Sequence, residues 1–235
     1  MKHEDLTVLY YTSNTISDYF MKNMQDQLKI SVGDTPIVCV SQKPMTFGTV
    51  NICVGVIGRS AYNIYKQVLI AAKAAETEYC ATAEDDVLYP PEHFEYRPKG
   101  DVFAYDTNKW SMFTWTQPPF FSIKPRTNMT SLIVRREPLI RTLEERFARW
   151  PDKDNIPLSY FGEPGRFENH LGITGLQKEQ VMLSVPHIMF STTEALAFGH
   201  LGYRKAHSQT RATELPYWGS AEHILSLYKK PEPTC

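Results

Sequence analysis

The chain has 235 residues, enough for one α/β domain with a sizeable core. Hydrophobic residues make up 42% of the chain and charged residues 22%, which excludes a disordered protein. The formal net charge of -1 excludes strong attraction of the whole molecule to a polyanion, so nucleic-acid contact would need a local patch.

The four cysteines form no CxxC pair. Cys39, Cys53 and Cys80 lie in or beside apolar runs, where free thiols behave as small hydrophobes, so we expect no zinc ribbon and no disulfide framework. The first residues are polar, and no apolar run is long enough to span a bilayer. We therefore expect a cytoplasmic protein without a membrane span, and its oligomeric state stays open.

The first part of the chain predicts a β-α-β unit. Residues 6–11 are an apolar run of strand formers, and the polar trio at 12–14 ends that run. Apolar residues then recur at helical spacing over 16–30, and residues 36–40 indicate a second buried strand. This order implies a parallel strand pair.

A second unit follows, and it ends in three acids. Ser60 is a candidate N-cap for a helix whose apolar face runs from Ala61 to Ala72. Residues 79–83 predict a short buried strand, directly followed by the acids at 84–86. Carboxylates at the end of a parallel strand lie in the crevice that open α/β sheets use for ligands.

The second half of the chain has a different pattern. We expect strands at 101–105 and 110–115 with a tight turn at 107–108, a strand at 129–134, a helix at 137–150, loops with short helices at 151–180, a weak strand at 188–190 and a helix at 222–228.

The acids Glu84, Asp85 and Asp86 have the chemistry of a divalent-cation site. Hard cations prefer carboxylate oxygens, and a diphosphate needs only one or two protein carboxylates because phosphates and waters complete the coordination. Glu84 and Asp86 form an ExD variant of the DxD signature. The alternative is an ordinary acidic turn at a strand end.

Three stretches resemble, in chain order, the motifs of GT-A glycosyltransferases: LTVLYYTSN at 6–14, GRSAYN at 58–63 and YCATAEDDVLYPPEHF at 79–94. The third is similar to that of a bacterial and phage group whose metal motif reads E-x-D-V-L-Y-x-P, although Asp85 stands where that group more often has histidine. The resemblance is good over residues 6–115 and weaker beyond.

The resemblance implies an α/β fold of the GT-A (Rossmann-like) type, with a mostly parallel central sheet flanked by helices. It implies one domain over 1–235, in which about 1–115 bind the nucleotide sugar and about 116–235 bind the acceptor. The implied activity is transfer of a sugar from a nucleotide-sugar donor, a UDP-sugar being favoured, to an acceptor hydroxyl with Mn²⁺ or Mg²⁺.

In such a fold the ends of the first two strands hold the base and ribose, and residues before the next helix meet the diphosphate or sugar. The candidate donor-binding residues are Thr12, Ser13, Asn14, Gln42, Arg59, Asn63, Asp85 and, near the C-terminus, Arg204. An arginine suits a phosphate because its planar fork bonds two oxygens. The alternative for the polar residues is turn and N-cap chemistry.

The resemblance also implies a C-terminal histidine as a further metal ligand. The stretch STTEALAFGHLGYRK at 191–205 is similar to that place, so the candidate metal ligands are Glu84, Asp86 and His200. His170, His187 and His207 are competitors.

An inverting transfer needs a general base near the acceptor hydroxyl. Glu163 and Glu168 lie in the Gly- and Pro-containing stretch FGEPGRFENHLG at 161–172 and are the candidates. A retaining enzyme needs no such base, and solvated loop acids are the alternative.

Aromatic and basic residues gather in the middle of the chain: Trp110, Phe113, Trp115, Phe120 and Phe121 precede Lys124, Arg126, Arg135, Arg136, Arg141, Arg146 and Arg149. They suit a saccharide, a lipid-phosphate or modified DNA with a hydroxymethylated base as acceptor. Core aromatics and helix arginines paired with Glu137, Glu144 and Glu145 are the favoured alternative.

Two other functions stay open. A nucleotidyltransferase also combines an α/β sheet with metal-binding carboxylates, but it normally has a Gly-rich loop after the first strand, where this chain has Thr12-Ser13-Asn14. A non-catalytic sugar- or nucleic-acid-binding module is the other, and such a module has no use for a metal at a leaving phosphate.

Overall fold

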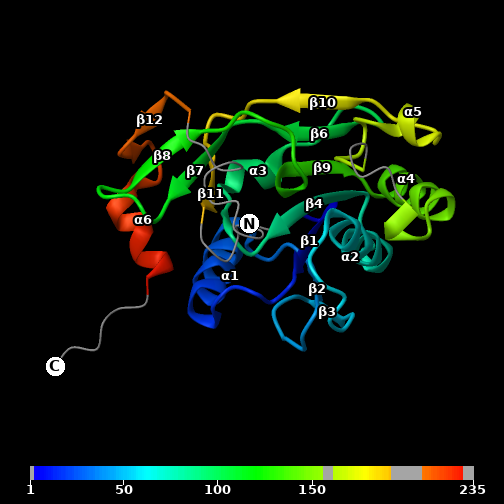
Figure 1. The fold of residues 1–235 in the computed structure, drawn as a ribbon, viewed down its shortest axis with the longest axis horizontal. Coiled ribbons are helices and arrows are strands. Elements are labelled where there is room, and N and C mark those ends of the chain that lie inside the picture. Colours follow the sequence, from blue (N-terminus) through cyan, green and yellow to red (C-terminus); the bar gives the residue numbers. More distant parts are fainter. Residues whose placement is uncertain (1–2, 156–160, 192–207, 230–235) are drawn as a thin grey trace.

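The computed structural model describes residues 3–155, 161–191 and 208–229 (Figure 1). Its larger sheet has the strand order β10-β6-β9-β4-β1-β2-β3. These strands are β1 (Leu6–Thr12), β2 (Ile37–Ser41), β3 (Val50–Cys53), β4 (Tyr79–Glu84), β6 (Phe103–Asp106), β9 (Leu132–Arg135) and β10 (Lys178–Val181). β9 runs antiparallel to both neighbours, and the other neighbouring pairs are parallel.

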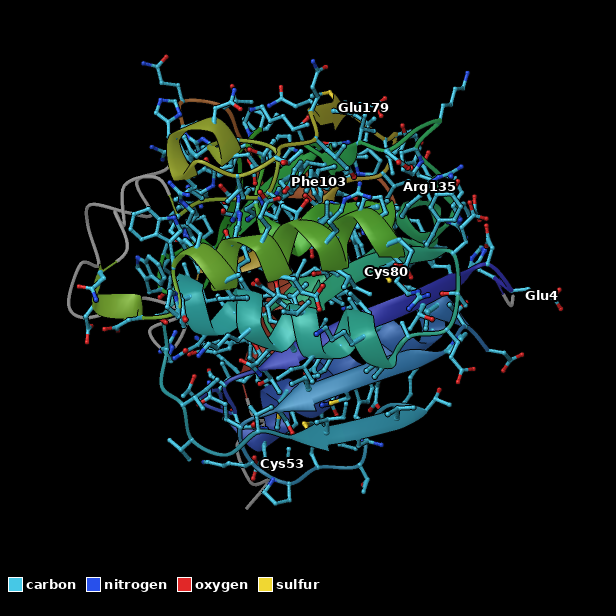
Figure 2. The ribbon with its side chains drawn as sticks, turned by 90° about the vertical axis from the view of Figure 1, so that its right-hand side faces the viewer. Glu4, Cys53, Cys80, Phe103, Arg135 and Glu179 are labelled. Carbon is cyan, nitrogen blue, oxygen red and sulfur yellow. The ribbon has the colours of Figure 1, made fainter. Side chains whose placement is uncertain are left out.

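Helices cover both faces of this sheet, which confirms the predicted α/β class with a mostly parallel central sheet flanked by helices. α2 (Ala61–Ala74) and α4 (Arg136–Arg149) lie side by side on one face, as Figure 2 shows. α1 (Asp18–Val32) and α3 (Pro91–Glu95) pack on the other. Successive residues of a strand point to opposite faces, so Leu9 packs in the core under α2 and Val8 in the core under α1.

A second sheet lies beside the first, with the order β12-β8-β7-β11-β5. Its strands are β5 (Val87–Leu88), β7 (Lys109–Phe113), β8 (Phe120–Ile123), β11 (His187–Ser191) and β12 (Arg211–Ala212). Helix α6 (Ala221–Tyr228) packs with α1 against this sheet, where Phe20 contacts Phe190 and Tyr228 edge-on. The shorter elements are η1 (Met129–Ser131), η2 (Lys153–Asn155), α5 (Glu168–Leu171) and the hairpin β13 (Glu214–Leu215) and β14 (Gly219–Ser220).

Local signals predicted the helix starts well. The Ser60 side chain accepts a hydrogen bond from the backbone N–H of Asn63 at 3.1 Å, so it caps α2 as expected. The predicted terminal helix is α6, which begins one residue earlier than expected.

The turn at 107–108 is present, but it does not join two strands of one sheet. Asp106 Oδ1 accepts from the backbone N–H of Asn108 at 2.9 Å, which bends the chain. β6 before the turn pairs with β9 and β10, whereas β7 after it pairs with β8 and β11. The turn therefore carries the chain from the first sheet to the second.

Three further expectations need correction. Residues 129–131 form a 3-10 turn, so the strand expected at 129–134 begins only at Leu132. The stretch expected to be loop at 151–180 contains the start of β10. Cys53 is exposed, because it lies on the edge strand β3, while Cys39 and Cys80 are buried as expected. None of the helices in the described part of the chain has the length and apolar character that a bilayer span requires.

A buried ion pair fixes helix α4 to the start of α5. The guanidinium of Arg146 donates to Glu168 Oε1, and the two side chains are 0% and 3% exposed. The same guanidinium donates to the carbonyl of Gly162 at 2.7 Å, and Glu168 Oε2 accepts from the backbone N–H of Phe167 at 3.0 Å. Removing one partner would leave the other charge buried without compensation.

We predict that Glu168→Gln lowers the free energy of unfolding by about 3 kcal/mol, because the Arg146 charge stays buried. Urea denaturation measures the effect. The control is Glu163→Gln. Glu163 pairs with Arg166 at 3.5 Å, and the Arg166 side chain is 48% exposed, so we expect this variant to cost less than about 1 kcal/mol. Equal losses in the two variants would contradict a special role of the buried pair.

Candidate functional site

A cavity of about 200 Å³ opens at the carboxyl edge of β1, β2 and β4, beside the start of α2. Its lining includes eight of the predicted donor and metal residues: Thr12, Ser13, Gln42, Arg59, Asn63, Glu84, Asp85 and Asp86. Parallel strands place their carboxyl ends at one edge, which explains how segments up to 74 positions apart meet here. The sequence-based grouping of these residues is thus reproduced in space.

Asn14 is near the cavity but does not line it. Its backbone has a φ of 53°, and its Oδ1 accepts from the backbone N–H groups of Gln42 and Lys43, each at 2.9 Å. Asn14 therefore ties the loop after β1 to the loop after β2, which is a positioning role.

Two predicted amides hold the loop that carries Arg59. Gln42 Nε2 donates to the carbonyl of Gly58 at 2.9 Å, and its Oε1 accepts from the backbone N–H groups of Ile57 and Gly58 at 3.1 and 3.0 Å. Asn63 Nδ2 donates to the carbonyls of Ile57 and Gly58 at 2.5 and 3.0 Å. Gly58 has a φ of 83°, which favours glycine. The two amides fix the backbone from which Arg59 extends.

Gln67 is a cavity residue that the sequence analysis missed. Its side chain is buried, and Nε2 donates to the carbonyls of Thr12 and Val40, both at 3.0 Å. It thereby holds the ends of β1 and β2 together. The available signal was an amide on the otherwise apolar face of α2, one turn after Asn63.

Each of the first two acids has a hydroxyl donor. Tyr11 Oη donates to Glu84 Oε1 at 2.5 Å, and the Thr12 hydroxyl donates to Asp85 Oδ2. The backbone N–H of Glu84 also donates to Tyr89 Oη at 3.0 Å. The tyrosines were not predicted as site residues, although both lie within the quoted motifs, Tyr11 at 6–14 and Tyr89 at 79–94.

Burial raises the pKa of Glu84 to about 8 and that of Asp85 to about 7. The charge of Asp86 is the second cause of both shifts, and the hydrogen bonds from Tyr11 and Thr12 oppose them. Three acids that repel one another around a cavity form a donor set that fits a hard divalent cation, which would relieve the repulsion.

The three acids do not by themselves bring three ligand atoms to one point. Within the described ranges, the group that does so is His93, Asp106 and His187. The geometry at 84–86 therefore suits an ion that takes one or two carboxylates and completes its coordination with phosphates and water.

The remaining predicted residues lie elsewhere. Glu163 lies 3.5 Å from Arg166, Glu168 is held by Arg146, and neither lines the cavity. In this structure Glu168 is an ion-pair partner in the core, so its role as a base stays a prediction that requires Arg146 to release it. His200 and Arg204, with the competitor His207, lie outside the described residues.

The aromatic residues divide between core and surface. Phe121 packs in the core, whereas Trp115 is 45% exposed. Phe113 stacks on Phe120 with ring centroids 5.0 Å apart, and the Arg211 guanidinium lies 4.8 Å above the Phe120 ring. Of the helix arginines, Arg136 pairs with Glu137 at 2.6 Å, as the favoured alternative expects. The expected pairs with Glu144 and Glu145 are not found in the described residues: Glu144 pairs with Lys73 at 2.5 Å, and Glu145 accepts from the backbone N–H of Thr174 at 2.8 Å.

No protein-family model matches this chain. No curated protein matches it either. Among solved structures, the glycosyltransferase GlyE of Streptococcus pneumoniae TIGR4 shares 9% identity at a TM-score of 0.43, with 64% of this chain and 40% of that chain covered. S. aureus TarS shares 11% identity at a TM-score of 0.42, with 79% of this chain and 36% of that chain covered. The bifunctional IspDF from Campylobacter jejuni shares 11% identity at a TM-score of 0.41, with 77% of this chain and 50% of that chain covered. The chain thus spans half or less of each of these structures, and similarities at this level assign no function.

We predict that Asp85→Asn stabilises the protein at pH 8 in EDTA, by about 1 kcal/mol or about 2–4 °C in melting temperature. The folded pKa of about 7 exceeds the ordinary 3.8. The folded state therefore holds the proton more tightly, and its stability falls as pH rises between these two values.

Melting curves at pH 5, 6, 7 and 8 measure the difference between variant and wild type, which should grow with pH. Asp34→Asn, at an exposed aspartate in the loop between α1 and β2, is the control and should show no such trend. A pH-independent difference for Asp85→Asn would rule out repulsion among the acids as its cause.

Proposed function

We propose that the protein is a metal-dependent glycosyltransferase of the GT-A type, which transfers a sugar from a nucleotide-sugar donor to an acceptor hydroxyl. One observation carries the proposal: Arg59 and the acids Glu84, Asp85 and Asp86 line one cavity at the carboxyl edge of parallel strands. A nucleoside diphosphate needs both a cationic fork and a metal-binding carboxylate in this place.

Arg59 supports the proposal because, within the described ranges, it forms no ion pair and so keeps its charge available to an anion. It is exposed, and among the described residues none accepts a hydrogen bond from its guanidinium. Its charge lowers the pKa of Asp85, which places it within electrostatic reach of the acids. We assign it to the donor phosphates, which its planar fork binds with two hydrogen bonds.

Glu84 and Asp86 would hold the metal. Bound Mn²⁺ or Mg²⁺ supplies neutralisation of the charge that develops on the departing diphosphate. Glu84 is held in place by the Tyr11 hydroxyl and by the Tyr89 contact to its backbone. Asp85 accepts from Thr12, which keeps this carboxylate directed at the cavity wall near the end of β1.

Thr12 and Ser13 are assigned to the base and ribose, a uridine nucleotide being favoured, and Gln42, predicted as a donor-binding residue, is assigned to holding the loop that carries Arg59. The second half of the chain, including Trp115 and Phe120, is assigned to the acceptor, either a saccharide or a hydroxymethylated base in phage DNA. Glu163 is the remaining accessible candidate for a base in an inverting transfer. A nucleotidyltransferase is disfavoured because the loop after β1 is shaped by Asn14 and lacks a glycine-rich segment.

We predict that Asp86→Ala abolishes metal-dependent turnover, with a loss of more than about 100-fold, because a carboxylate of the metal site is removed. A screen of nucleotide sugars with Mn²⁺, scoring hydrolysis and transfer, identifies the donor and then measures the variant. The control is Asp34→Ala, at an exposed residue before the amino end of β2 and so at the other end of this strand from the cavity, which should keep wild-type turnover. Full activity in Asp86→Ala would remove the proposal.

We predict that Arg59→Gln weakens binding of the nucleoside diphosphate by about 10-fold or more, since a charged hydrogen bond contributes about 1.5–3 kcal/mol. Titration calorimetry with UDP and Mn²⁺ measures the dissociation constant. The control is Lys43→Gln. Lys43 is an exposed charge next to Gln42 in the chain, and it does not itself line the cavity. If Lys43→Gln weakens binding equally, general electrostatics and not a direct contact explains the effect.

A further inference from the structure

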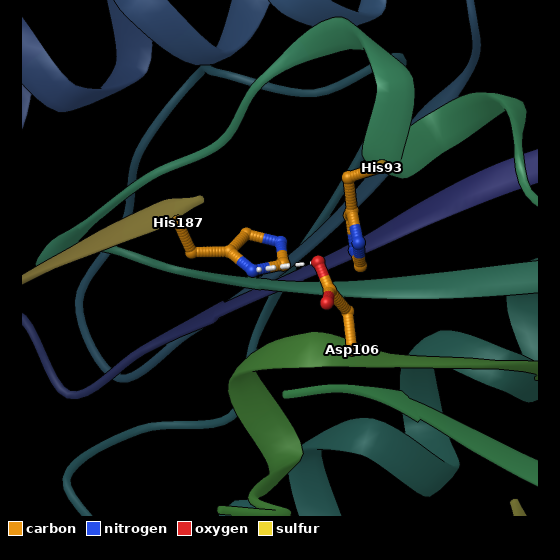
Figure 3. Close-up of side chains that lie close together, drawn as sticks. All are labelled: His93, Asp106 and His187. Atoms are coloured by element: carbon orange, nitrogen blue, oxygen red, sulfur yellow. Dashed lines mark ion pairs between the residues drawn. The ribbon is translucent and has the colours of Figure 1, made fainter. Parts of the chain in front are cut away.

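Three buried side chains converge at a point outside the donor cavity. His93 comes from α3, Asp106 from the end of β6 and His187 from the start of β11, and Figure 3 shows the three pointing toward one another. All three are 0% exposed. One potential ligand atom from each lies within 4.8 Å of the others.

The polar atoms of this cluster are not satisfied by the described parts of the protein. Both ring nitrogens of His93, both of His187 and Asp106 Oδ2 have no hydrogen-bond partner there. His187 Nδ1 lies 3.2 Å from Asp106 Oδ2, but the direction of approach is not that of a hydrogen bond. Each buried unsatisfied group costs about 1–3 kcal/mol, so a cluster of them indicates a missing ligand.

The donor set suits a transition metal. Two imidazoles and one carboxylate are ligands typical of Zn²⁺, whereas Mg²⁺ prefers oxygen alone. Asp106 Oδ1 accepts from the backbone N–H groups of Asn108 and Leu183 at 2.9 and 3.2 Å, which orients Oδ2 toward the histidines. Burial lowers the pKa of His93 to about 3 and holds the pKa of His187 well below its ordinary value, so both rings are in the neutral form that binds metals.

The distances are close to those of a tetrahedral site. Ligand atoms about 2.0 Å from zinc are about 3.3 Å apart, and the separation between His187 and Asp106 is already 3.2 Å. The longer separations, up to 4.8 Å, require side-chain movements of about 1–2 Å.

A competing charge is nearby. Lys109 is buried, its ammonium donates to Asn128 and Thr130, and its charge lowers the pKa of both histidines. Burial lowers the pKa of Lys109 itself to about 7, so this residue can lose its proton when an ion binds.

We propose that His93, Asp106 and His187 bind one structural zinc-type ion, with a water in the fourth position, that joins α3, β6 and β11. Full burial keeps substrates away from this ion, so it is separate from the ion proposed at Glu84 and Asp86. The ion would also help to position the donor cavity, because Tyr89 contacts both histidines and Glu84. The Tyr89 ring packs 5.5 Å from His93 and 5.2 Å from His187, and its hydroxyl holds the backbone of Glu84.

The test begins with the wild-type full chain, purified without chelator and dialysed against Zn²⁺ or Co²⁺. We expect about one tightly held ion per chain by elemental analysis, and an intense visible absorption with Co²⁺ that is typical of a tetrahedral site. Adding 1,10-phenanthroline should lower the melting temperature by about 10 °C. A folded wild type that holds no stoichiometric ion and has the same melting temperature with chelator would overturn the proposal.

Variants locate the ion. His187→Gln and His93→Gln should lose it, whereas His170→Gln, at an exposed histidine of α5, and Asp86→Ala should retain it. Loss of the ion in Asp86→Ala with retention in folded His187→Gln would place it in the donor cavity and overturn the proposal. Because this experiment counts ions and does not measure turnover, its outcome is independent of the proposed glycosyl transfer.

Discussion

The hydrogen bond from the backbone N–H of Glu84 to Tyr89 Oη fixes the point where the chain leaves the larger sheet. β4 ends at Glu84, and after the turn at 85–86 the chain enters β5 of the second sheet. The carbonyl of Asp86 accepts from the backbone N–H of Phe190 in β11. The three acids therefore lie at the junction of two sheets, and neither sheet can shift without moving them.

This junction holds like charges together, which opposes folding. The charge of Asp86 raises the pKa of Glu84 and of Asp85, while the hydrogen bonds from Tyr11 and Thr12 and the charges of Lys109 and Arg59 offset part of that rise. A turn between two strands needs no carboxylates, since Asn, Ser or Gly would serve without repulsion. A destabilising charge cluster at a sheet edge that opens into a cavity is the pattern expected where binding a cation, and not the fold, determines the residues.

The first half of the fold was predictable because its signals are local. β1, α2 and β4 follow from apolar runs, helical spacing and the N-cap Ser60, all within a few residues. The second sheet was not predictable, because β7 pairs with β11 across 78 positions, as in the pair Trp110 and Ile188. β10 also escaped, since Lys178–Val181 is a polar edge strand without apolar alternation. The burial of Glu168 was not predictable from residues 161–172, because its partner Arg146 lies 22 residues away in α4.

At the candidate site the sequence identified residue types but could not separate binding from positioning. An amide that binds a ribose and an amide that fixes a loop cannot be told apart in the sequence, because each needs partners for its donors and its acceptor. The structure separates them by partners. Asn14 accepts from the backbone of Gln42 and Lys43, whereas Gln42 and Asn63 bond to backbone groups of Ile57 and Gly58 and so fix the segment at 57–58. Arg59 extends from that fixed segment and lines the cavity. A rigid base beneath a guanidinium reduces the entropy lost when an anion binds, so the positioning amides contribute to affinity without touching the ligand.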